Sequence, residues 1–240
     1  MNTLKDKTAY ITGGTKGIGY AVAAALLSRG ANTIITGRKE ESALAAADRL
    51  NGEGYPGRAI GVAADVRDLN SQATAIQAGV TAFGGVDFVI ANAGIGHFAP
   101  IQDLSAEQWQ ETIDVNLTGV FNSVKAGLGE LVRNEGYLIT IASLAGTNFF
   151  ATGGAYNASK FGLVGFSQAI MLDLRPQGVK VSTIMPGSVS TFFNDHTPSP
   201  EDAWKIQPED IGQIVVDLLQ MPARTLPSKV EVRPSKTKGM

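Results

Sequence analysis

Short apolar runs alternate with longer helix-prone segments along the whole chain. The runs contain Val, Ile, Thr and Tyr, and they predict strands near residues 8–12, 33–36, 58–63, 86–91, 137–142, 180–185 and 228–232. Segments with helix-forming residues lie between them. Strands that alternate with helices are joined by right-handed crossovers, which produce a parallel sheet covered by helices on both faces. The pattern therefore predicts an α/β fold with a doubly wound parallel sheet of about seven strands.

The alternation continues without a break in composition, an internal repeat or a low-complexity linker. A parallel α/β sheet of this kind commonly reaches the 240 residues of the chain as one unit, so we expect residues 1–240 to form a single domain. The pair Pro198 and Pro200 marks one irregular segment. Ligands of such folds bind at the carboxyl ends of the strands, where the strand order reverses.

Composition excludes several classes of function. The chain has no cysteine and only two histidines, His97 and His196, which lie far apart in sequence, so we expect no metal site. A formal charge of −2 gives no reason to expect nucleic acid as a partner. No apolar run approaches the roughly 20 residues that span a bilayer, and no apolar signal segment precedes the first strand. We expect a cytoplasmic protein that does not bind membranes.

A glycine-rich turn follows the first predicted strand. Residues 13–19 read Gly-Gly-Thr-Lys-Gly-Ile-Gly, and an alanine-rich helical segment follows them. Glycine allows a phosphate to approach the backbone closely, and the N-terminus of a helix offers free N–H groups to an anion. The spacing T-G-x-x-x-G-x-G differs from the common G-x-G-x-x-G, but the turn stands between a strand and a helix as a dinucleotide site requires. The segment predicts a site for a pyrophosphate.

The end of the second strand predicts which dinucleotide is bound. An NAD site places an acidic side chain here, where it bonds to the ribose 2′-hydroxyl. This chain has Gly37 and Arg38 instead, and the planar guanidinium of Arg38 suits a 2′-phosphate. Lys16 adds a second positive charge, while Glu40 and Glu41 fit the first turn of the next helix. The pattern favours NADP(H) over NAD(H), unless Arg38 and Lys16 are ordinary solvated charges.

Tyr156 and Lys160 are the candidate catalytic pair. Residues four positions apart lie on one face of a helix, and Gly153 and Gly154 indicate that this helix begins near Ala155. A nearby ammonium group lowers the pKa of a phenol from about 10 toward the range useful for acid–base catalysis. Tyr-x-x-x-Lys also occurs by chance as two solvated side chains, so the pair depends on the nucleotide motif for support.

Together these motifs resemble the short-chain dehydrogenase/reductase family, in its single-domain branch, over nearly the whole chain. The resemblance implies a Rossmann fold and a cofactor-binding set formed by Gly13, Thr15, Lys16, Gly17, Ile18, Gly19, Arg38, Asp65, Val66, Asn92, Ala93, Gly94, Tyr156, Lys160, Pro186, Gly187, Val189 and Thr191. It implies the catalytic set Asn116, Ser143, Tyr156 and Lys160. Ala91 and Ala142 depart from the usual family pattern, but neither is a catalytic position.

The resemblance also implies a mechanism. Ser143 would bind the carbonyl oxygen of the substrate, and Tyr156 would give that oxygen a proton. Lys160 would lower the pKa of the phenol and bind the ribose of the nicotinamide. Asn116 would support a water that resupplies the proton. The small-molecule substrate would be a carbonyl compound or a secondary alcohol.

Substrate choice and assembly are less clear from the sequence. We expect the substrate near His97-Phe98, Phe149-Phe150 and residues 192–206, whose phenylalanines form either an apolar pocket or ordinary packing. The helix expected over about 107–133 and the helix after Tyr156 have apolar and small residues on several faces. Relatives pair these helices, so we expect a homo-oligomer, a dimer or a tetramer, although the faces also suit an intramolecular core.

Four interpretations of the function compete. The leading one is an NADP(H)-dependent carbonyl reductase or alcohol dehydrogenase. Its rival within the class is a 3-oxoacyl-thioester reductase of fatty-acid synthesis, which needs a basic patch for an acidic carrier, whereas Arg133 and Arg175 are scattered in sequence. A regulator that senses NADPH without turnover, or a scaffold protein, is disfavoured by the intact Ser143, Tyr156 and Lys160.

Overall fold

A parallel sheet forms the centre of the computed structural model, which describes residues 3–236. Its strands are β1 (Thr8–Ile11), β2 (Asn32–Gly37), β3 (Ala59–Ala63), β4 (Phe88–Ala91), β5 (Tyr137–Ile141), β6 (Lys180–Pro186) and β7 (Lys229–Val232). They are arranged in the order β3-β2-β1-β4-β5-β6-β7, and every neighbouring pair is parallel. The strand order reverses between β1 and β4. The predicted doubly wound sheet of about seven strands is therefore confirmed.

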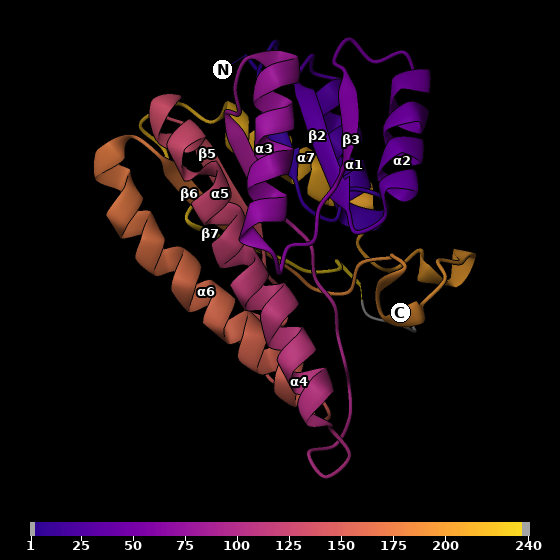
Figure 1. The fold of residues 1–240 in the computed structure, drawn as a ribbon. Helices are drawn as coiled ribbons and strands as arrows, with labels where there is room; N and C mark the ends of the chain where they lie inside the picture. Colours follow the sequence, from indigo (N-terminus) through magenta and orange to yellow (C-terminus); the bar gives the residue numbers. More distant parts are fainter. Residues whose placement is uncertain (1–2, 237–240) are drawn as a thin grey trace.

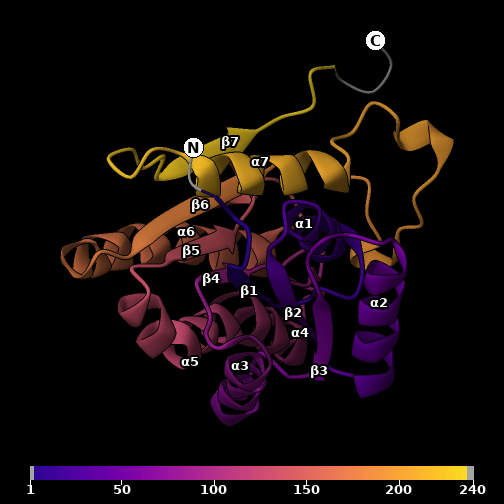
Figure 2. The ribbon, with the colours of Figure 1, turned by 90° about the horizontal axis from the view of Figure 1, so that it is seen from above.

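Helices cover both faces of this sheet. They are α1 (Gly17–Leu27), α2 (Glu40–Gly52), α3 (Leu69–Phe83), α4 (Ala106–Ile113), α5 (Gly119–Arg133), α6 (Gly154–Leu174) and α7 (Pro208–Gln220). Seen from above, α1 and α7 lie on one side of the sheet and α3 and α5 on the other (Figure 2). Each face has its own apolar core. Alanines and larger apolar side chains of α1, α2 and α7 contribute to the first core, and those of α3, α5 and α6 contribute to the second.

Strand β1 shows why these strands read as continuous apolar runs. Successive side chains of a strand point to opposite faces. Ala9 and Ile11 accordingly pack in the core beneath α1, whereas Tyr10 packs in the core beneath α3 and α5. All four residues of β1 are buried. A parallel strand that is covered on both faces has no solvated side, so it shows no alternation of apolar and polar residues.

The helix expected over about 107–133 is interrupted. After α4, residues Asp114–Thr118 form one π-helical turn, and α5 begins at Gly119. A π-turn inserts an extra residue into an α-helix and is frequent at functional sites. Asn116 lies in this turn, and its side chain bonds to the backbone of Ile95. This tertiary contact explains the departure from the expected continuous helix.

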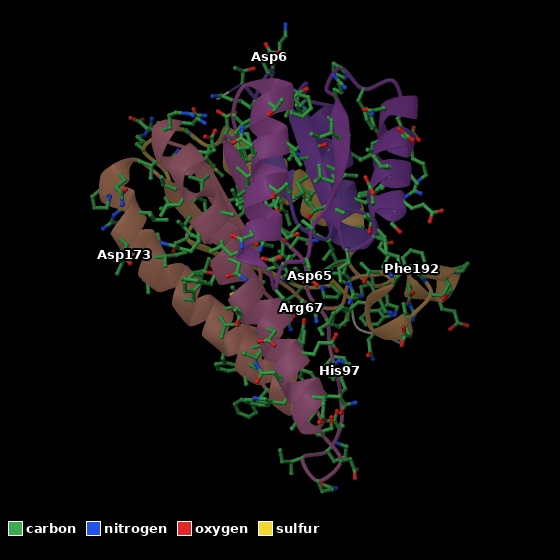
Figure 3. The ribbon with its side chains drawn as sticks, viewed as in Figure 1. Asp6, Asp65, Arg67, His97, Asp173 and Phe192 are labelled. Carbon is green, nitrogen blue, oxygen red and sulfur yellow. The ribbon has the colours of Figure 1, made fainter. Side chains whose placement is uncertain are left out.

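The carboxyl ends of the strands meet at one edge of the sheet. The orange segment between β6 and α7 lies along this lower edge in Figure 1. Asp65, Arg67, His97 and Phe192 lie in the same region in Figure 3, whereas Asp6 lies at the opposite end of the molecule. Within the described residues, no helix is both long and apolar enough to span a membrane.

Candidate active site

A cavity of about 1290 Å³ lies at the carboxyl edge of the sheet. Most residues that the sequence analysis assigned to the site line it. They are Gly13, Thr15, Lys16, Gly17, Ile18, Arg38, Asp65, Val66, Asn92, Ala93, Gly94, Ser143, Tyr156, Lys160, Pro186, Gly187, Val189 and Thr191. Gly19 and Asn116 are not among the lining residues. The volume lies above the range typical of small-ligand pockets, as a dinucleotide together with a second ligand would require.

The glycine turn has a shape that side chains would prevent. Gly13 and Gly17 have φ values of +63° and +58°, which favour glycine. A Cβ atom at Gly19 would lie 2.5 Å from the carbonyl oxygen of Gly13 and 2.6 Å from Nδ2 of Asn92. The Asn92 amide donates to the carbonyl oxygens of Thr12 and Gly13 at 2.9 and 3.1 Å. Gly19 therefore allows the turn to close against β4, and Asn92 holds it there.

The start of α1 suits an anion. Lys16 is the N-cap residue, and its side chain makes no capping hydrogen bond to the first turn. The first N–H groups of a helix lack partners within the helix and attract negative charge. Gly13, Lys16, Gly17 and Ile18 all line the cavity beside them. These residues fit the pyrophosphate of a dinucleotide.

The end of β2 is closed to an acidic side chain. A Cβ atom at Gly37 would lie 2.7 Å from Cγ2 of Thr15, so the adjacent Thr15 occupies the space that a side chain would need. The next residue, Arg38, is exposed and lines the cavity. Lys16 lies over the Phe192 ring, with Nζ 5.5 Å from the ring centroid. Two cations, Arg38 and Lys16, thus lie near the end of this strand and the glycine turn, and position 37 itself offers no acidic side chain.

Asp65 has a partner that the sequence analysis missed. Its carboxylate accepts hydrogen bonds from Nε and Nη2 of Arg67, with Nη2 at 2.5 Å (Figure 3). The Arg67 hydrogen bonds hold the pKa of Asp65 below its usual range, and the charge of Arg38 acts in the same direction. The two residues are only two positions apart in a loop. Two residues at this spacing have no fixed geometry outside helices and strands, so the sequence alone did not indicate the Asp65–Arg67 ion pair.

The Tyr156–Lys160 pair differs electrostatically from the expectation. Tyr156 lies in the first turn of α6, which begins at Gly154, one residue before the expected start. Burial raises the pKa of the Tyr156 phenol, and a hydrogen bond with Ser143 only partly opposes this effect. The net lowering of this pKa expected from the sequence is therefore not found. Desolvation disfavours the phenolate more strongly than its neighbours favour it.

Lys160 is itself affected by burial, which lowers its pKa from 10.5 to about 8. Its ammonium group donates to the carbonyl oxygen of Ile141 at 3.1 Å and lies 5.7 Å from the centroid of the Tyr156 ring. The lysine is thus held between the end of β5 and the phenol. Its charge is fixed in place but poorly solvated.

Ser143 follows β5 and caps a short helical turn. Its hydroxyl oxygen accepts a hydrogen bond from the backbone N–H of Ala145 at 3.1 Å. The hydroxyl can donate to the carbonyl oxygen of Pro186, but only at the long distance of 3.5 Å. A weak intramolecular acceptor leaves this proton available to a stronger one, such as a substrate oxygen.

Asn116 positions the loop after β4. Its Oδ1 accepts from the backbone N–H of Ile95 at 2.8 Å, and its Nδ2 donates to the carbonyl oxygen of Ile95 and to Oγ of Ser159. Both N–H groups of the side-chain amide are therefore used. A Cβ atom at Gly94 would lie 3.4 Å from Oδ1 of Asn116 and 3.6 Å from Nζ of Lys160. The amide thus holds the loop directly against Lys160.

The segments expected near the substrate also line the cavity. They contribute His97, Phe98, Phe149, Phe150, Phe192, Phe193, His196, Trp204 and Lys205. Among the lining residues that were missed, three are charged, namely Glu111, Arg233 and Lys236. Glu111 lies 2.9 Å from Nε2 of His97, across the loop between β4 and α4. Arg233 and Lys236 follow β7, and only the order of the strands brings them to this edge.

One carboxylate fastens the segment between β6 and α7. Asp202 is nearly buried and lies 2.6 Å from Nζ of Lys205, 2.5 Å from Nε2 of His196 and 3.3 Å from Oγ of Ser190. The hydrogen bonds from Lys205 and His196 hold its pKa well below the usual range. No group of three or more metal-ligating side chains occurs among residues 3–236.

The cavity lies at the carboxyl edge of a doubly wound sheet, the place where such folds bind dinucleotides. The family model of the short chain dehydrogenases matches residues 7–202. The chain therefore belongs to the short chain dehydrogenase family, as its motifs predict.

Relatives cover almost the whole chain. An uncharacterized oxidoreductase of Staphylococcus aureus (strain MW2) is 32% identical over 98% of this chain and 100% of its own length. An alcohol dehydrogenase of Thermococcus sibiricus, solved in complex with 5-hydroxy-NADP, has a TM-score of 0.90 and 29% identity, and the match covers 98% and 99% of the two chains. A 3-ketoacyl-ACP reductase of Sinorhizobium meliloti 1021 has a TM-score of 0.85 and 31% identity over 94% and 96%.

Proposed function

We propose that this protein is an NADP(H)-dependent oxidoreductase that interconverts a carbonyl compound and a secondary alcohol. The observation that carries the proposal is the convergence of Ser143, Tyr156 and Lys160 on the cavity that the glycine turn also lines. A binding-only protein has no need of a phenol, a hydroxyl and an ammonium group gathered beside a dinucleotide site. The bound cofactor would supply or accept the hydride.

The residues have distinct tasks in the reduction. The Ser143 hydroxyl donates a hydrogen bond to the carbonyl oxygen as negative charge develops on it. Tyr156 then gives that oxygen its proton. The raised pKa of Tyr156 keeps the phenol protonated at neutral pH, which is the state that a proton donor needs. Lys160 stands beside the phenol and favours its ionised form when the proton leaves.

Two features support NADP(H) over NAD(H). Thr15 fills the space where an acidic side chain at position 37 would stand, so a ribose 2′-hydroxyl finds no carboxylate there. Arg38 and Lys16 line the cavity near the same strand end and suit a 2′-phosphate. The Thermococcus sibiricus alcohol dehydrogenase, which was solved with 5-hydroxy-NADP, gives this preference further support.

The test is oxidation of NADPH and of NADH against a panel of ketones, aldehydes, quinones and acetoacetyl thioesters. Tyr156→Phe should abolish turnover while the dissociation constant for NADPH changes less than threefold. Tyr55→Phe is the matched control, because Tyr55 lies outside the cavity. Turnover that survives in Tyr156→Phe would contradict the assigned proton donor. Tight NADPH binding without turnover on any carbonyl would favour the sensing regulator.

A 3-oxoacyl-thioester substrate is the second candidate. Lys205, Arg233 and Lys236 line the cavity, so cations that are scattered in sequence gather at its edge. The Sinorhizobium meliloti neighbour is a 3-ketoacyl-ACP reductase. Comparison of acetoacetyl-CoA with its neutral N-acetylcysteamine thioester tests this reading. A preference above tenfold for the CoA ester that Arg233→Ala removes would support it, and equal rates would reject it.

We also propose that the protein forms a homo-oligomer through α5 and α6. Phe121 and Phe161 are more than two-fifths exposed on these helices, and Phe121 packs against Phe166. Sedimentation velocity should show a dimer or a tetramer, and Phe161→Asp should shift the distribution toward monomer. A monomeric native protein would contradict the proposal. The cytoplasmic location stays a prediction.

A further inference from the structure

Aromatic rings from three separate loops form a cluster beside Tyr156, in which two of the rings contact the phenol itself. Phe98, from the loop after β4, lies 5.4 Å from the Tyr156 ring between centroids, in an edge-to-face arrangement. Phe193, from the segment after β6, lies 5.6 Å from the same ring and 6.2 Å from Phe98. Phe150, from the loop after β5, lies 5.7 Å from Phe98. All these distances suit aromatic pairs.

The rings are not fully covered by protein. Phe193 and Phe150 are 37% and 48% exposed, and both line the cavity. Side chains that serve only to fill a core are buried, whereas these present apolar surface to an open space beside the catalytic phenol. The wall of the cavity next to Tyr156 is thus aromatic and has room for another group.

Gly96 makes this arrangement possible. A Cβ atom at Gly96 would lie 2.7 Å from Cζ of Phe193 and 2.8 Å from Cζ of Phe98. Any side chain at position 96 would therefore push the two rings away from their present positions. Phe193 and Phe98 thus pack against the backbone of the loop after β4 at Gly96.

The backbone turns immediately after Phe193, whose ring lines the cavity. Asn194 and Asp195 both have positive φ, at 55° and 57°, which reverses the chain at this point. The adjacent Phe192 takes a different course, because its ring lies under the Lys16 ammonium group. Two neighbouring phenylalanines of one loop therefore serve two parts of the cavity, Phe192 the glycine turn and Phe193 the phenol.

We infer that Phe193 selects carbonyl substrates with an aromatic ring attached directly to the carbonyl carbon. With its oxygen at Ser143 and Tyr156, such a substrate places its ring in the space bounded by Phe98, Phe150 and Phe193. Aromatic pairs in offset or edge-to-face geometry interact more favourably than their buried area alone provides. An aliphatic group of equal size gains the burial but not this additional term. The inference rests on the proposed function and names its substrate class.

A matched pair of ketones tests it. Acetophenone and cyclohexyl methyl ketone have the same carbon skeleton and differ in the aromaticity of the ring. We expect kcat/KM with NADPH to favour acetophenone by at least tenfold. Phe193→Leu, which retains apolar bulk, should reduce the preference below threefold, and Phe193→Ala should do the same. Gly96→Ala, which displaces both rings, should lower kcat/KM for acetophenone more than for the aliphatic ketone.

Phe192→Ala is the matched control, since it removes a neighbouring ring of the same loop that is also partly exposed, at 47% against 37% for Phe193. It should leave the ratio between the two ketones unchanged, even if the KM for NADPH rises. Thermal unfolding of each variant verifies that the fold is retained. A native ratio near one would overturn the inference, and so would an equal change of the ratio in the Phe192 and Phe193 variants.

Failure of the inference is distinguishable from failure of the proposed function. Turnover of the aliphatic ketone alone, lost in Tyr156→Phe, would reject the aromatic preference and keep the oxidoreductase assignment. If neither ketone reacts, binding of 1-phenylethanol and 1-cyclohexylethanol is measured by NMR line broadening in the presence of NADP⁺. Stronger broadening of the aromatic alcohol that Phe193→Leu abolishes would support the site, and equal binding would reject it.

Discussion

The glycine turn and the segment between β6 and α7 line the same cavity, but they are built in opposite ways. The turn, residues 12–19, is defined by backbone: two glycines with positive φ, a buried Thr12, and an amide of Asn92 that holds two carbonyl groups. The segment, residues 188–206, is defined by side chains. Its phenylalanines are exposed, and Asp202 fastens it.

The difference corresponds to two kinds of ligand. A dinucleotide is the same in every turnover, so a site of backbone N–H groups and glycines suits it, and a change there affects binding as a whole. A substrate pocket formed by side chains can be altered residue by residue while the fold persists. Four predictions test this contrast, and they follow from the largest expected effect to the smallest.

Gly19→Ala should cause the largest loss. The new Cβ would lie 2.5 Å from the Gly13 carbonyl oxygen and force the turn to open. We expect NADPH affinity to fall more than 100-fold, about 2.7 kcal/mol, as measured by calorimetry. Gly129→Ala is the control, because a Cβ there meets nothing within 4 Å, and it should stabilise α5 slightly. Native affinity in Gly19→Ala would break the comparison.

Lys160→Met should change the pH dependence of stability. The folded-state pKa of Lys160 is lowered to about 8, so the unfolded chain binds more protons between pH 8 and 10.5. The free energy of unfolding of the native protein should therefore rise by about 2 kcal/mol from pH 7.5 to 9.5. In Lys160→Met this rise should disappear, whereas the exposed Lys125→Met should retain it.

The measurement is urea unfolding at several pH values. The window ends at pH 9.5 because burial raises the pKa values of Tyr10 and Tyr137. Groups whose pKa is raised in this way destabilise the fold as pH rises above the ordinary value of about 10. An equal rise in both lysine variants would show that Lys160 is not the group responsible.

Arg38→Ala should affect the cofactor preference alone. Loss of the guanidinium should weaken NADPH about tenfold, roughly 1.4 kcal/mol, and leave NADH affinity within twofold. Lys39→Ala provides the comparison, since Lys39 is exposed but does not line the cavity. Equal weakening of both cofactors by Arg38→Ala would argue against a 2′-phosphate site.

Asp202→Asn should have the smallest effect and should be confined to the substrate side. Without the carboxylate, Lys205 and His196 lose their shared partner. We expect a rise in substrate KM of about threefold and faster proteolysis within residues 190–205, with NADPH affinity unchanged. Glu201→Gln, an exposed neighbour, should show neither change. A loss of NADPH affinity in Asp202→Asn would show that the two regions are coupled.

Sequence predicts well what depends on short spacing. The glycine turn lies within eight residues, and Tyr156 and Lys160 lie one helical turn apart, so both follow from local geometry. The alternation of strands and helices fixes the order of layers, and the observed sheet confirms it. Each of these features is specified by neighbours in the chain.

Features that depend on burial or on distant contacts were not predictable in the same way. The pKa of Tyr156 is set by desolvation, which depends on loops that pack around it. The π-turn follows from a hydrogen bond between Asn116 and Ile95, twenty-one residues apart. Arg233 and Lys236 reach the cavity only because β7 lies beside β6. Nothing in the local pattern of these residues indicates such contacts.

The π-turn at Asp114–Thr118 also depends on the number of residues between α4 and α5. The five residues between α4 and α5 include one more than a regular α-helical course would need, and the Asn116 amide in this turn bonds to the backbone of Ile95. Deletion of a single residue here would let the two helices join as one regular α-helix, with better backbone geometry. The same deletion would rotate every following residue of the turn by about 100° relative to α4. The chain can therefore form either one regular helix here or the π-turn that holds the loop beside Lys160. The number of residues between α4 and α5 decides between the two, whatever those residues are.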